Sequence, residues 1–242
     1  MPDRNSNGRL YFKQLLSGRD FARGDRIASQ MVNFTYVVGD LKTRQVVLVD
    51  PSYDIAGLQG AVEGDGMEVV GVVATHFHPD HIGGDLFGHR IEGVAELLSV
   101  NDVPVHVAID EVEWIVDYTE LDRNSLVAHH SGDIVEVGEV HLELIHTPGH
   151  TPGSQCILVD GKLITGDTLF LDGCGRVDLP GGDPEALYES ITGRLARISD
   201  DTQVYPGHRY SPQETELMGV TREHNYVFHF GNLQRWLSAF GR

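Results

Sequence analysis

A histidine-rich run follows the most strongly apolar stretch in the first third of the chain and has the sequence Thr75-His76-Phe77-His78-Pro79-Asp80-His81. The apolar stretch is rich in β-branched residues and is predicted to form a buried strand. At its end, His76 and His78 are two residues apart and project to the same side. Pro79 disfavours helix at His78, so the chain can turn and bring Asp80 and His81 to the same point. Imidazole and carboxylate ligands together suit zinc, manganese or ferrous iron.

Three later segments each place a potential ligand beside glycine or proline at the end of a predicted strand: Pro148-Gly149-His150, Gly166-Asp167 and Pro206-Gly207-His208. Ligands on such loops can converge on one point while the sheets beneath keep them rigid. Glycine fits where the backbone must approach an ion closely or adopt a positive φ. Histidines scattered over polar loops would require four such loops to arise independently. The sequence therefore predicts one metal site built from four loops.

In chain order, these motifs resemble the metallo-β-lactamase superfamily, with His-x-His-x-Asp-His, TPGHTPGS, GDTLF followed by GCGR, and YPGH. The match runs from about Val32 to Tyr210, which is most of the chain. The resemblance implies an α/β (α+β) fold, the αββα sandwich, with the metals at one edge. Within the superfamily, the chain is most similar to the glyoxalase II (hydroxyacylglutathione hydrolase) branch.

The resemblance also implies a cofactor of two divalent metal ions. Zinc is the favoured metal, with iron or manganese as alternatives. One site would consist of His76, His78 and His150. The other would consist of Asp80, His81 and His208, with Asp167 bridging the two ions. All seven positions carry the expected residue type.

The activity implied is hydrolysis of a thioester. A hydroxide shared by the two ions would attack the thioester carbonyl, and the positive charge would stabilise the oxyanion. Asp80 is the predicted catalytic residue, since it would orient the nucleophile. Arg176 and Tyr210 are predicted to contact the substrate.

Two alternative activities remain open. The GCGR-x-D motif also resembles persulfide dioxygenases, which are taken to hold one ferrous ion with the equivalents of His76, His150 and Asp167. Thr168-Leu169-Phe170 and Gly207-His208 favour the hydrolase. A lactonase is the further alternative, because the same machinery would cleave a lactone ester. A non-enzymatic binding module is disfavoured because none of the seven ligands is missing.

Length and composition are those of one domain spanning residues 1–242, with a short C-terminal helical segment from about residue 211. No apolar stretch approaches the roughly 20 residues that span a bilayer, so we expect no membrane partner. Residues 1–8 carry no apolar segment of the signal-peptide type, which favours a cytoplasmic location and disfavours an exported β-lactamase. The two cysteines are predicted to pack and not to form a disulfide framework.

The excess of acidic over basic residues indicates which kinds of partner the protein can bind. Only 18 Lys and Arg face 36 Asp and Glu, for a formal net charge of −18. Nucleic acids are bound by neutralising phosphates with basic residues, so nucleic acid is excluded as a partner. The expected partner is a small-molecule substrate, and a homodimer is left open.

Hydrophobic patterns predict strands over residues 10–16, 31–38, 45–50 and within 132–159. Helices are predicted over residues 55–62, from Asp183-Pro184 onward, and as one helix across residues 225–240. Residues 85–99 depart from the glyoxalase II pattern and are predicted to form a lid or lengthened loop. His106 and His141 are predicted to lie on solvated strand faces, and Asp50 to brace a turn near the site.

Overall fold

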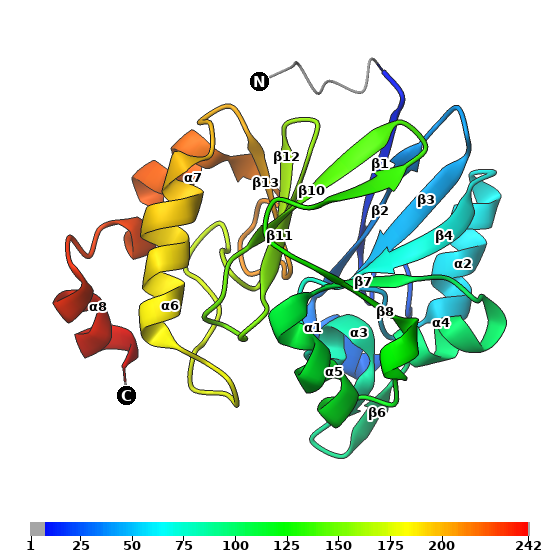
Figure 1. Cartoon of the computed structure of the whole chain (residues 1–242), viewed down its shortest axis with the longest axis horizontal. Helices are drawn as coiled ribbons and strands as arrows, with labels where there is room; N and C mark the ends of the chain where they lie inside the picture. Colours follow the sequence, from blue (N-terminus) through cyan, green and yellow to red (C-terminus); the bar gives the residue numbers. More distant parts are fainter. Residues whose placement is uncertain (1–7, 242) are drawn as a thin grey trace.

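The N-terminal half of the chain forms a six-stranded sheet in the computed structural model, which describes residues 8–241 (Figure 1). In spatial order the strands are β1 (Leu10–Leu16), β2 (Phe34–Asp40), β3 (Gln45–Val49), β4 (Glu68–Val73), β7 (Val105–Ala108) and β8 (Leu126–His129). The first three pair antiparallel, and β3, β4, β7 and β8 pair parallel. The second predicted strand begins at Phe34 and not at Met31, because helix α1 (Arg26–Met31) precedes it.

The C-terminal half forms a second six-stranded sheet. Its spatial order is β14 (Glu216–Leu217), β13 (Gln203–Pro206), β12 (Lys162–Gly166), β11 (Gln155–Val159), β10 (Val140–His146) and β9 (Ile134–Val137). Of its pairings, β12 with β13 is parallel and the others are antiparallel. A separate two-stranded hairpin extends from the first half and consists of β5 (Gly84–Leu86) and β6 (His89–Ile91).

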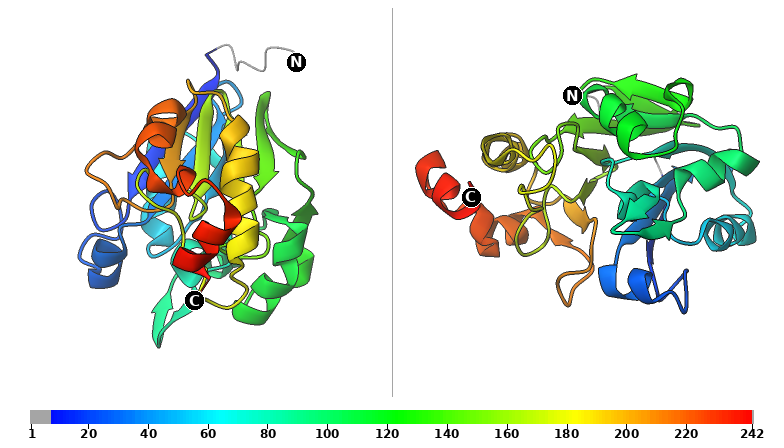
Figure 2. Two further views of the ribbon diagram at one scale, coloured as in Figure 1. Left: turned by 90° about the vertical axis from the view of Figure 1, so that its left-hand side faces the viewer. Right: turned by 90° about the horizontal axis from the view of Figure 1, so that it is seen from below.

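Helices cover the outer faces of both sheets, which gives the predicted αββα order (Figures 1 and 2). The first sheet packs against α2 (Ile55–Gly64), α4 (Val94–Val100) and α5 (Val112–Tyr118). The second packs against α6 (Pro184–Glu189), α7 (Met218–His224) and α8 (Leu233–Phe240). The short elements are α3 (Pro79–Ile82), η1 (Ile109–Glu111), η2 (Arg123–Ser125), η3 (Ser190–Arg194), η4 (Leu195–Arg197) and η5 (Tyr226–Phe228).

The core consists of three apolar layers, and strand alternation assigns side chains to them. In β3, Val46 and Leu48 pack under the outer helices, whereas Val47 and Val49 pack between the sheets. The central strands are buried on both faces and therefore read as continuous apolar runs. This explains why the apolar strand before the histidine motif could be recognised from the sequence.

The prediction of one helix across residues 225–240 is wrong. The Asn225 side chain donates to the carbonyls of Phe170 and Gly173, each at 3.0 Å, which fixes the chain against the preceding loop. Gly231 then adopts a φ of +74°, and Asn232 caps a new helix, α8. The segment is therefore two short helices separated by a left-handed glycine. The single-domain organisation of residues 1–242 stays a prediction.

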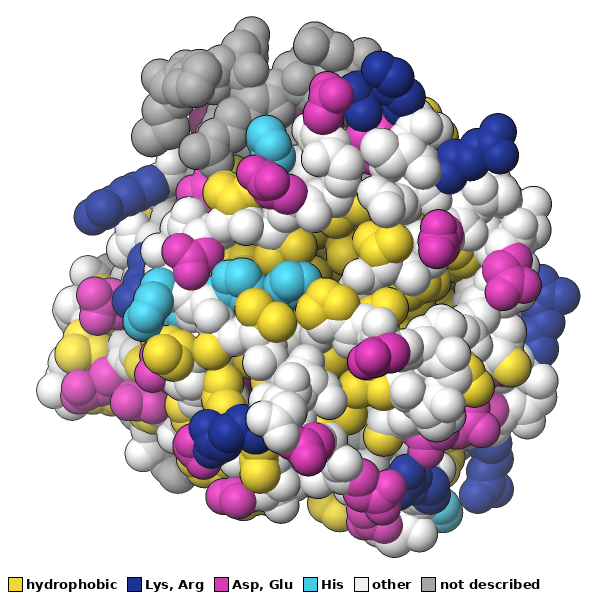
Figure 3. Space-filling view, turned by 45° about the vertical axis from the view of Figure 1, so that its right-hand side comes forward, with side chains coloured by type: hydrophobic (Ala, Val, Ile, Leu, Met, Phe, Trp, Pro, Cys, Tyr) yellow, Lys and Arg dark blue, Asp and Glu magenta, His cyan; other side chains and the backbone are white. Residues whose placement is uncertain are grey.

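Residues 1–7 lie outside the described residues. The expectation that the N-terminal sequence carries no signal-peptide segment falls on these residues. From residue 8 to residue 241, no helix is long and apolar enough to cross a membrane. Both cysteines are free, and Cys156 is fully buried, as predicted. On the face drawn in Figure 3, acidic side chains are interspersed with separated basic ones, and Lys and Arg do not gather into one patch.

Trp236 anchors α8, which generates a stability prediction. The side chain is fully buried, its indole N–H donates to the Pro184 carbonyl at 2.7 Å, and its ring stacks on Phe240. We expect Trp236→Ala to lower the free energy of unfolding by about 3–5 kcal/mol. Trp236→Phe keeps most of the ring contacts and should lose less. Urea unfolding measures both, and an alanine variant as stable as the parent would contradict this packing.

Candidate metal centre

The seven predicted ligand side chains lie together at one edge of the sandwich, the lower edge in Figure 1 where α3 is labelled. Four follow β4 in the first sheet, and the other three follow β10, β12 and β13 in the second: His76, His78, Asp80 and His81, then His150, Asp167 and His208. Each sheet therefore supplies part of the site. Among the described residues, three groups have ligating atoms within 4.8 Å of one another, and none of them includes Asp167: His76–His78–His150, Asp80–His81–His208, and Asp50–His76–His81. The first two are the predicted sites, and the third adds Asp50.

His76 is oriented by a short hydrogen-bond chain. The Thr75 hydroxyl donates to Oδ2 of Asp50 at 2.6 Å, so its oxygen accepts from Nδ1 of His76 at 2.9 Å. This assigns the ring proton to Nδ1 and leaves a lone pair on Nε2. Nε2 is buried and has no hydrogen-bond partner among the described residues. A buried, unpartnered nitrogen facing two further imidazoles fits a cation ligand.

His150 and His208 are held in the same manner by backbone carbonyls. Nδ1 of His150 donates to the Arg176 carbonyl at 2.6 Å, and Nδ1 of His208 donates to the Met31 carbonyl at 2.7 Å. In each ring, Nε2 is therefore the atom that faces the other ligands. Nε2 of His150 lies 3.0 Å from Nδ1 of His78.

Asp50 braces the site, as predicted. It accepts hydrogen bonds from the backbone N–H and the hydroxyl of Thr75, at 2.7 and 2.6 Å, and from Nδ1 of His81 at 2.9 Å. One carboxylate thus joins the end of β3 to the motif after β4 and sets the orientation of His81. Its oxygens are committed to these three donors, which explains why it orients ligands.

Asp167 lies between the two groups. One of its carboxylate oxygens is 3.4 Å from Nε2 of His81, and the other is 3.2 Å from Nε2 of His208 and 3.7 Å from Nε2 of His150. Oδ1 is buried without a hydrogen-bond partner in the described chain. In the second group, Asp80 lies 3.4 Å from Nε2 of His208.

The electrostatics of the centre favour positive charge between its carboxylates. Burial opposes charge on His81, but Asp167 and Asp80 raise its pKa to about 10. Burial also opposes charge on Asp167, yet His208 and His81 hold the pKa of that carboxyl well below its usual range. In the first group, burial and the neighbouring His150 lower the pKa of His78 to about 3, so this ring is a neutral donor. The carboxylates thus draw positive charge into the second group, where a divalent metal ion would supply that charge with His81 deprotonated as its ligand.

Glycine is required at two positions where the chain passes Asp167. A Cβ at Gly207 would lie 2.3 Å from Oδ1 of Asp167, and one at Gly175 would lie 2.1 Å from the Asp167 carbonyl oxygen. Any side chain at either position would displace Asp167. These glycines of YPGH and GCGR therefore allow the backbone to pass close to Asp167.

A cavity of about 620 Å³ opens onto the centre and is bordered by both predicted substrate residues. The Arg176 guanidinium is largely exposed and pairs with Asp178 at 2.6 Å. The Tyr210 ring stacks on His208, with centroids 4.7 Å apart and an interplanar angle of 7°. Tyr210 thus reaches the centre directly, whereas Arg176 is already paired with a neighbouring acid.

The sequence of residues 30–208 matches the family described as the metallo-beta-lactamase superfamily. The chain belongs to this superfamily. It is 26% identical to a probable polyketide biosynthesis zinc-dependent hydrolase of Bacillus subtilis, over 81% of each chain. It is 33% identical to a hydroxyacylglutathione hydrolase of Alkalilimnicola ehrlichii, over 74% of this chain and 62% of that enzyme. The crystal structure of ETHE1 from Myxococcus xanthus is similar with a TM-score of 0.77 and 27% identity, covering 96% of this chain and 90% of that one.

Asn33 belongs to the centre and was not anticipated. Its Nδ2 donates to Asp80 at 3.1 Å, and its Oδ1 accepts from the Tyr53 hydroxyl at 3.0 Å. The tyrosine therefore fixes which end of the amide faces the carboxylate. A single asparagine within the strand predicted over residues 31–38 carries no motif, so no sequence signal could have assigned this role.

Glu111 is a second unanticipated residue, and it ties two ligand loops together. The carboxylate accepts from the backbone N–H of Phe77 at 2.8 Å, the hydroxyl of Thr151 at 2.7 Å and the backbone N–H of Gly153 at 2.6 Å. Phe77 lies between two predicted ligands of the first loop, and Thr151 follows His150. Glu111 thus sets the distance between the loops without contacting a ligand.

The prediction that His106 lies on a solvated face is wrong. The ring is half-buried, and its Nδ1 lies 2.8 Å from Nε2 of His129 on the adjacent parallel strand. Burial lowers the pKa of His106 to about 4. His141 is exposed, as predicted.

Burial raises the pKa of Glu111 to about 7, against three hydrogen bonds that lower it. Because this pKa is above the ordinary value of a glutamate, the contribution of Glu111 to stability is greatest below about pH 4.5 and is lost as the pH rises through about 7. We expect Glu111→Gln to destabilise the protein by about 1–3 kcal/mol at about pH 5, and by less at about pH 8.

Urea unfolding at the two pH values measures the difference between parent and variant. Glu113→Gln, a substitution of an exposed acid on α5, is the matched control and should show little change. A parent–variant difference that widens with rising pH would contradict the buried, protonatable state of Glu111.

Proposed function

We propose that the protein is a metal-dependent hydrolase of thioesters that works with two divalent metal ions. Zinc is the favoured metal. The observation that carries the proposal is the pair of converging donor groups with Asp167 between them. The first ion would be held by His76, His78 and His150, the second by Asp80, His81 and His208, with Asp167 shared by both. Such ions act as Lewis acids and lower the pKa of bound water, so that hydroxide is available at neutral pH.

The residues of the chain position the reactants. Burial raises the pKa of Asp80, but His81 and His208 lower it further, so the net shift is downward and Asp80 is a carboxylate at neutral pH. It can therefore accept a hydrogen bond from the attacking water and orient it. The outward hydrogen bonds of the imidazoles hold the donor atoms still during the reaction. A thiolate is a good leaving group, so no strong general acid is required.

The second candidate is a persulfide dioxygenase. It is supported by the GCGR-x-D motif and by the similarity to ETHE1, whose human namesake is a persulfide dioxygenase, 29% identical to this chain. His76, His150 and Asp167 form the two-histidine, one-carboxylate set used by mononuclear iron oxygenases. The hydrolase is favoured because Asp80, His81 and His208 form a complete second group. A lactone is the further candidate substrate, since its ester carbonyl would be attacked in the same way.

His208 separates the candidates because it belongs only to the second group. For a dinuclear hydrolase, we expect His208→Ala to lower the metal content from about two ions per chain to about one. Its kcat/KM for an acyl thioester should fall at least ~100-fold. Metal content is measured by elemental analysis after anaerobic purification. His141→Ala, an exposed histidine on β10, is the matched control and should behave like the parent.

A His208→Ala variant that hydrolyses thioesters at the parent rate would exclude the dinuclear hydrolase. One ferrous ion per chain in the parent, with oxygen uptake on a persulfide, would establish the dioxygenase instead.

A further inference from the structure

The cavity above the metal centre has two aromatic walls. On one side, Phe77 stacks on Trp114 and Trp114 on Tyr118, with ring centroids 5.3 and 5.6 Å apart. On the other side, Phe170 meets Tyr210 edge to face at 4.9 Å. Phe77 and Tyr118 border the cavity, as do Phe170 and Tyr210. Phe77 and Phe170 are buried behind the tyrosines, which are about half exposed, so an apolar group in the cavity would contact the rings of Tyr118 and Tyr210.

The β5–β6 hairpin adds a third apolar surface at the mouth. Its tip residue Phe87 borders the cavity and is 90% exposed. Phe87 has a φ of +52° and Gly88 a φ of +83°, the pattern of a tight hairpin turn that suits glycine or asparagine at both positions. A phenylalanine there is strained, and it gains no burial within the fold. Within the fold, this ring has no packing role, and it is free to contact a molecule that enters the cavity.

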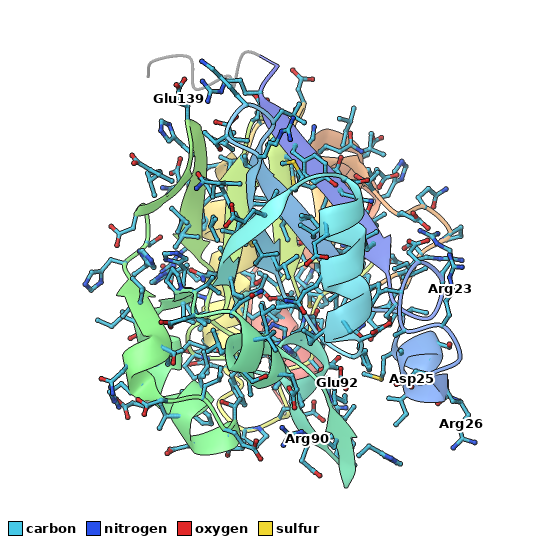
Figure 4. All side chains as sticks on the ribbon, turned by 90° about the vertical axis from the view of Figure 1, so that its right-hand side faces the viewer. Arg23, Asp25, Arg26, Arg90, Glu92 and Glu139 are labelled. Carbon is cyan, nitrogen blue, oxygen red and sulfur yellow. The ribbon has the colours of Figure 1, made fainter. Side chains whose placement is uncertain are left out.

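The hairpin is held in place from its second strand. The Arg90 guanidinium pairs with Glu120 and with Glu96, each at 2.7 Å, which ties β6 to α4 and to the turn after α5. Figure 4 labels Arg90 on the hairpin, which projects from the lower edge of the molecule. These exposed ion pairs link the second strand of the hairpin to its neighbours, and Phe87 lies at the tip beyond them.

The charges around the cavity disfavour an anionic ligand. Of the Lys and Arg residues in the described part of the chain, only Arg176 borders the cavity, and Asp178 already pairs with it. Asp85 and Asp172 border the cavity without belonging to the metal centre. The C-terminal segment contributes Tyr226, an uncharged side chain. Glutathione carries a carboxylate at each end and one ammonium group, and its carboxylates would find one cation, already paired, at the border of the cavity.

We infer, on the basis of the proposed thioesterase function, that the substrate is a thioester with an uncharged, apolar acyl group. The acyl chain lies between the aromatic walls and under Phe87. The thiol arm is uncharged near the sulfur. A volume of about 620 Å³ exceeds what a small hydroxyacyl group fills, and each further buried methylene is expected to raise kcat/KM about threefold.

Four thioesters test the inference, made from two acyl groups, octanoyl and lactoyl, and two thiols, N-acetylcysteamine and glutathione. With the metal-loaded full chain, we expect octanoyl-N-acetylcysteamine to have the highest kcat/KM and lactoylglutathione the lowest, at least ~30-fold apart. The octanoyl preference should appear with both thiols. A preference for lactoyl thioesters, or equal rates for all four, would overturn the inference.

Phe87→Asn separates binding from folding, because asparagine tolerates the left-handed backbone. We expect this variant to be as stable as the parent and to lose about tenfold in kcat/KM for octanoyl thioesters, with lactoyl thioesters unaffected. Leu41→Asn, a half-exposed apolar residue in the β2–β3 turn, is the matched control and should change neither rate. An unchanged octanoyl preference in Phe87→Asn would contradict the role of the hairpin tip.

Binding of unreactive thioethers gives a readout that does not depend on turnover. Calorimetry with S-octyl-N-acetylcysteamine and with its S-(2-hydroxypropyl) counterpart should show at least tenfold tighter binding of the octyl compound. If the metal-loaded protein hydrolyses none of the four thioesters, the proposed function fails, and this comparison alone decides the inference. Equal binding of the two thioethers would then overturn it.

Discussion

Each buried imidazole at the sandwich edge has two nitrogens, and the surrounding fold determines which of them faces inward. The acceptors that engage Nδ1 come from widely separated parts of the chain: the Thr75 hydroxyl, the Asp50 carboxylate, and the backbone carbonyls of Met31 and Arg176. A displaced acceptor would free its ring to rotate or change tautomer, and the inward lone pair would be lost. The strands and loops at this edge therefore matter for the centre chiefly because they place the acceptors that orient the candidate metal ligands.

The two sheets meet this requirement because parallel strands bring their carboxyl ends to a common edge. In the first sheet β3 and β4 are parallel neighbours, and in the second β12 and β13 are. Asp50 and the histidine motif follow the first pair, while Asp167 and His208 follow the second. The two edges are joined by a bridge between Asn33 and His208, which lies outside both sheets. Contacts across this junction link residues far apart in the chain, so the centre forms only when both halves are in place.

Sequence patterns predicted the residues that belong to local motifs and missed the contacts between residues far apart in the chain. Ligands such as His76 and His78 were recognisable because their spacing, their strand and their turn lie within ten residues. The αββα order followed from the same motifs through family resemblance. The contacts of Asn33 with Asp80, and of Glu111 with Phe77 and Thr151, are separated by 34 to 47 positions and leave no pattern. The single C-terminal helix was mispredicted because apolar spacing does not reveal where a helix is interrupted. Here the hydrogen bonds of Asn225 hold the start of the segment against another loop.

The hairpin tip has a consequence for how such an enzyme can change over time. Phe87 supports no part of the core, so replacing it leaves the folded state nearly as stable as before. Gly175 and Gly207 tolerate no such change, because a side chain at Gly175 would collide with the backbone carbonyl of Asp167 and one at Gly207 with its carboxylate. Inherited variation at the hairpin tip is therefore compatible with an intact fold and an intact candidate metal centre, whereas variation at these two glycines is not. The molecule thus separates a surface that can change through single substitutions from a centre that cannot.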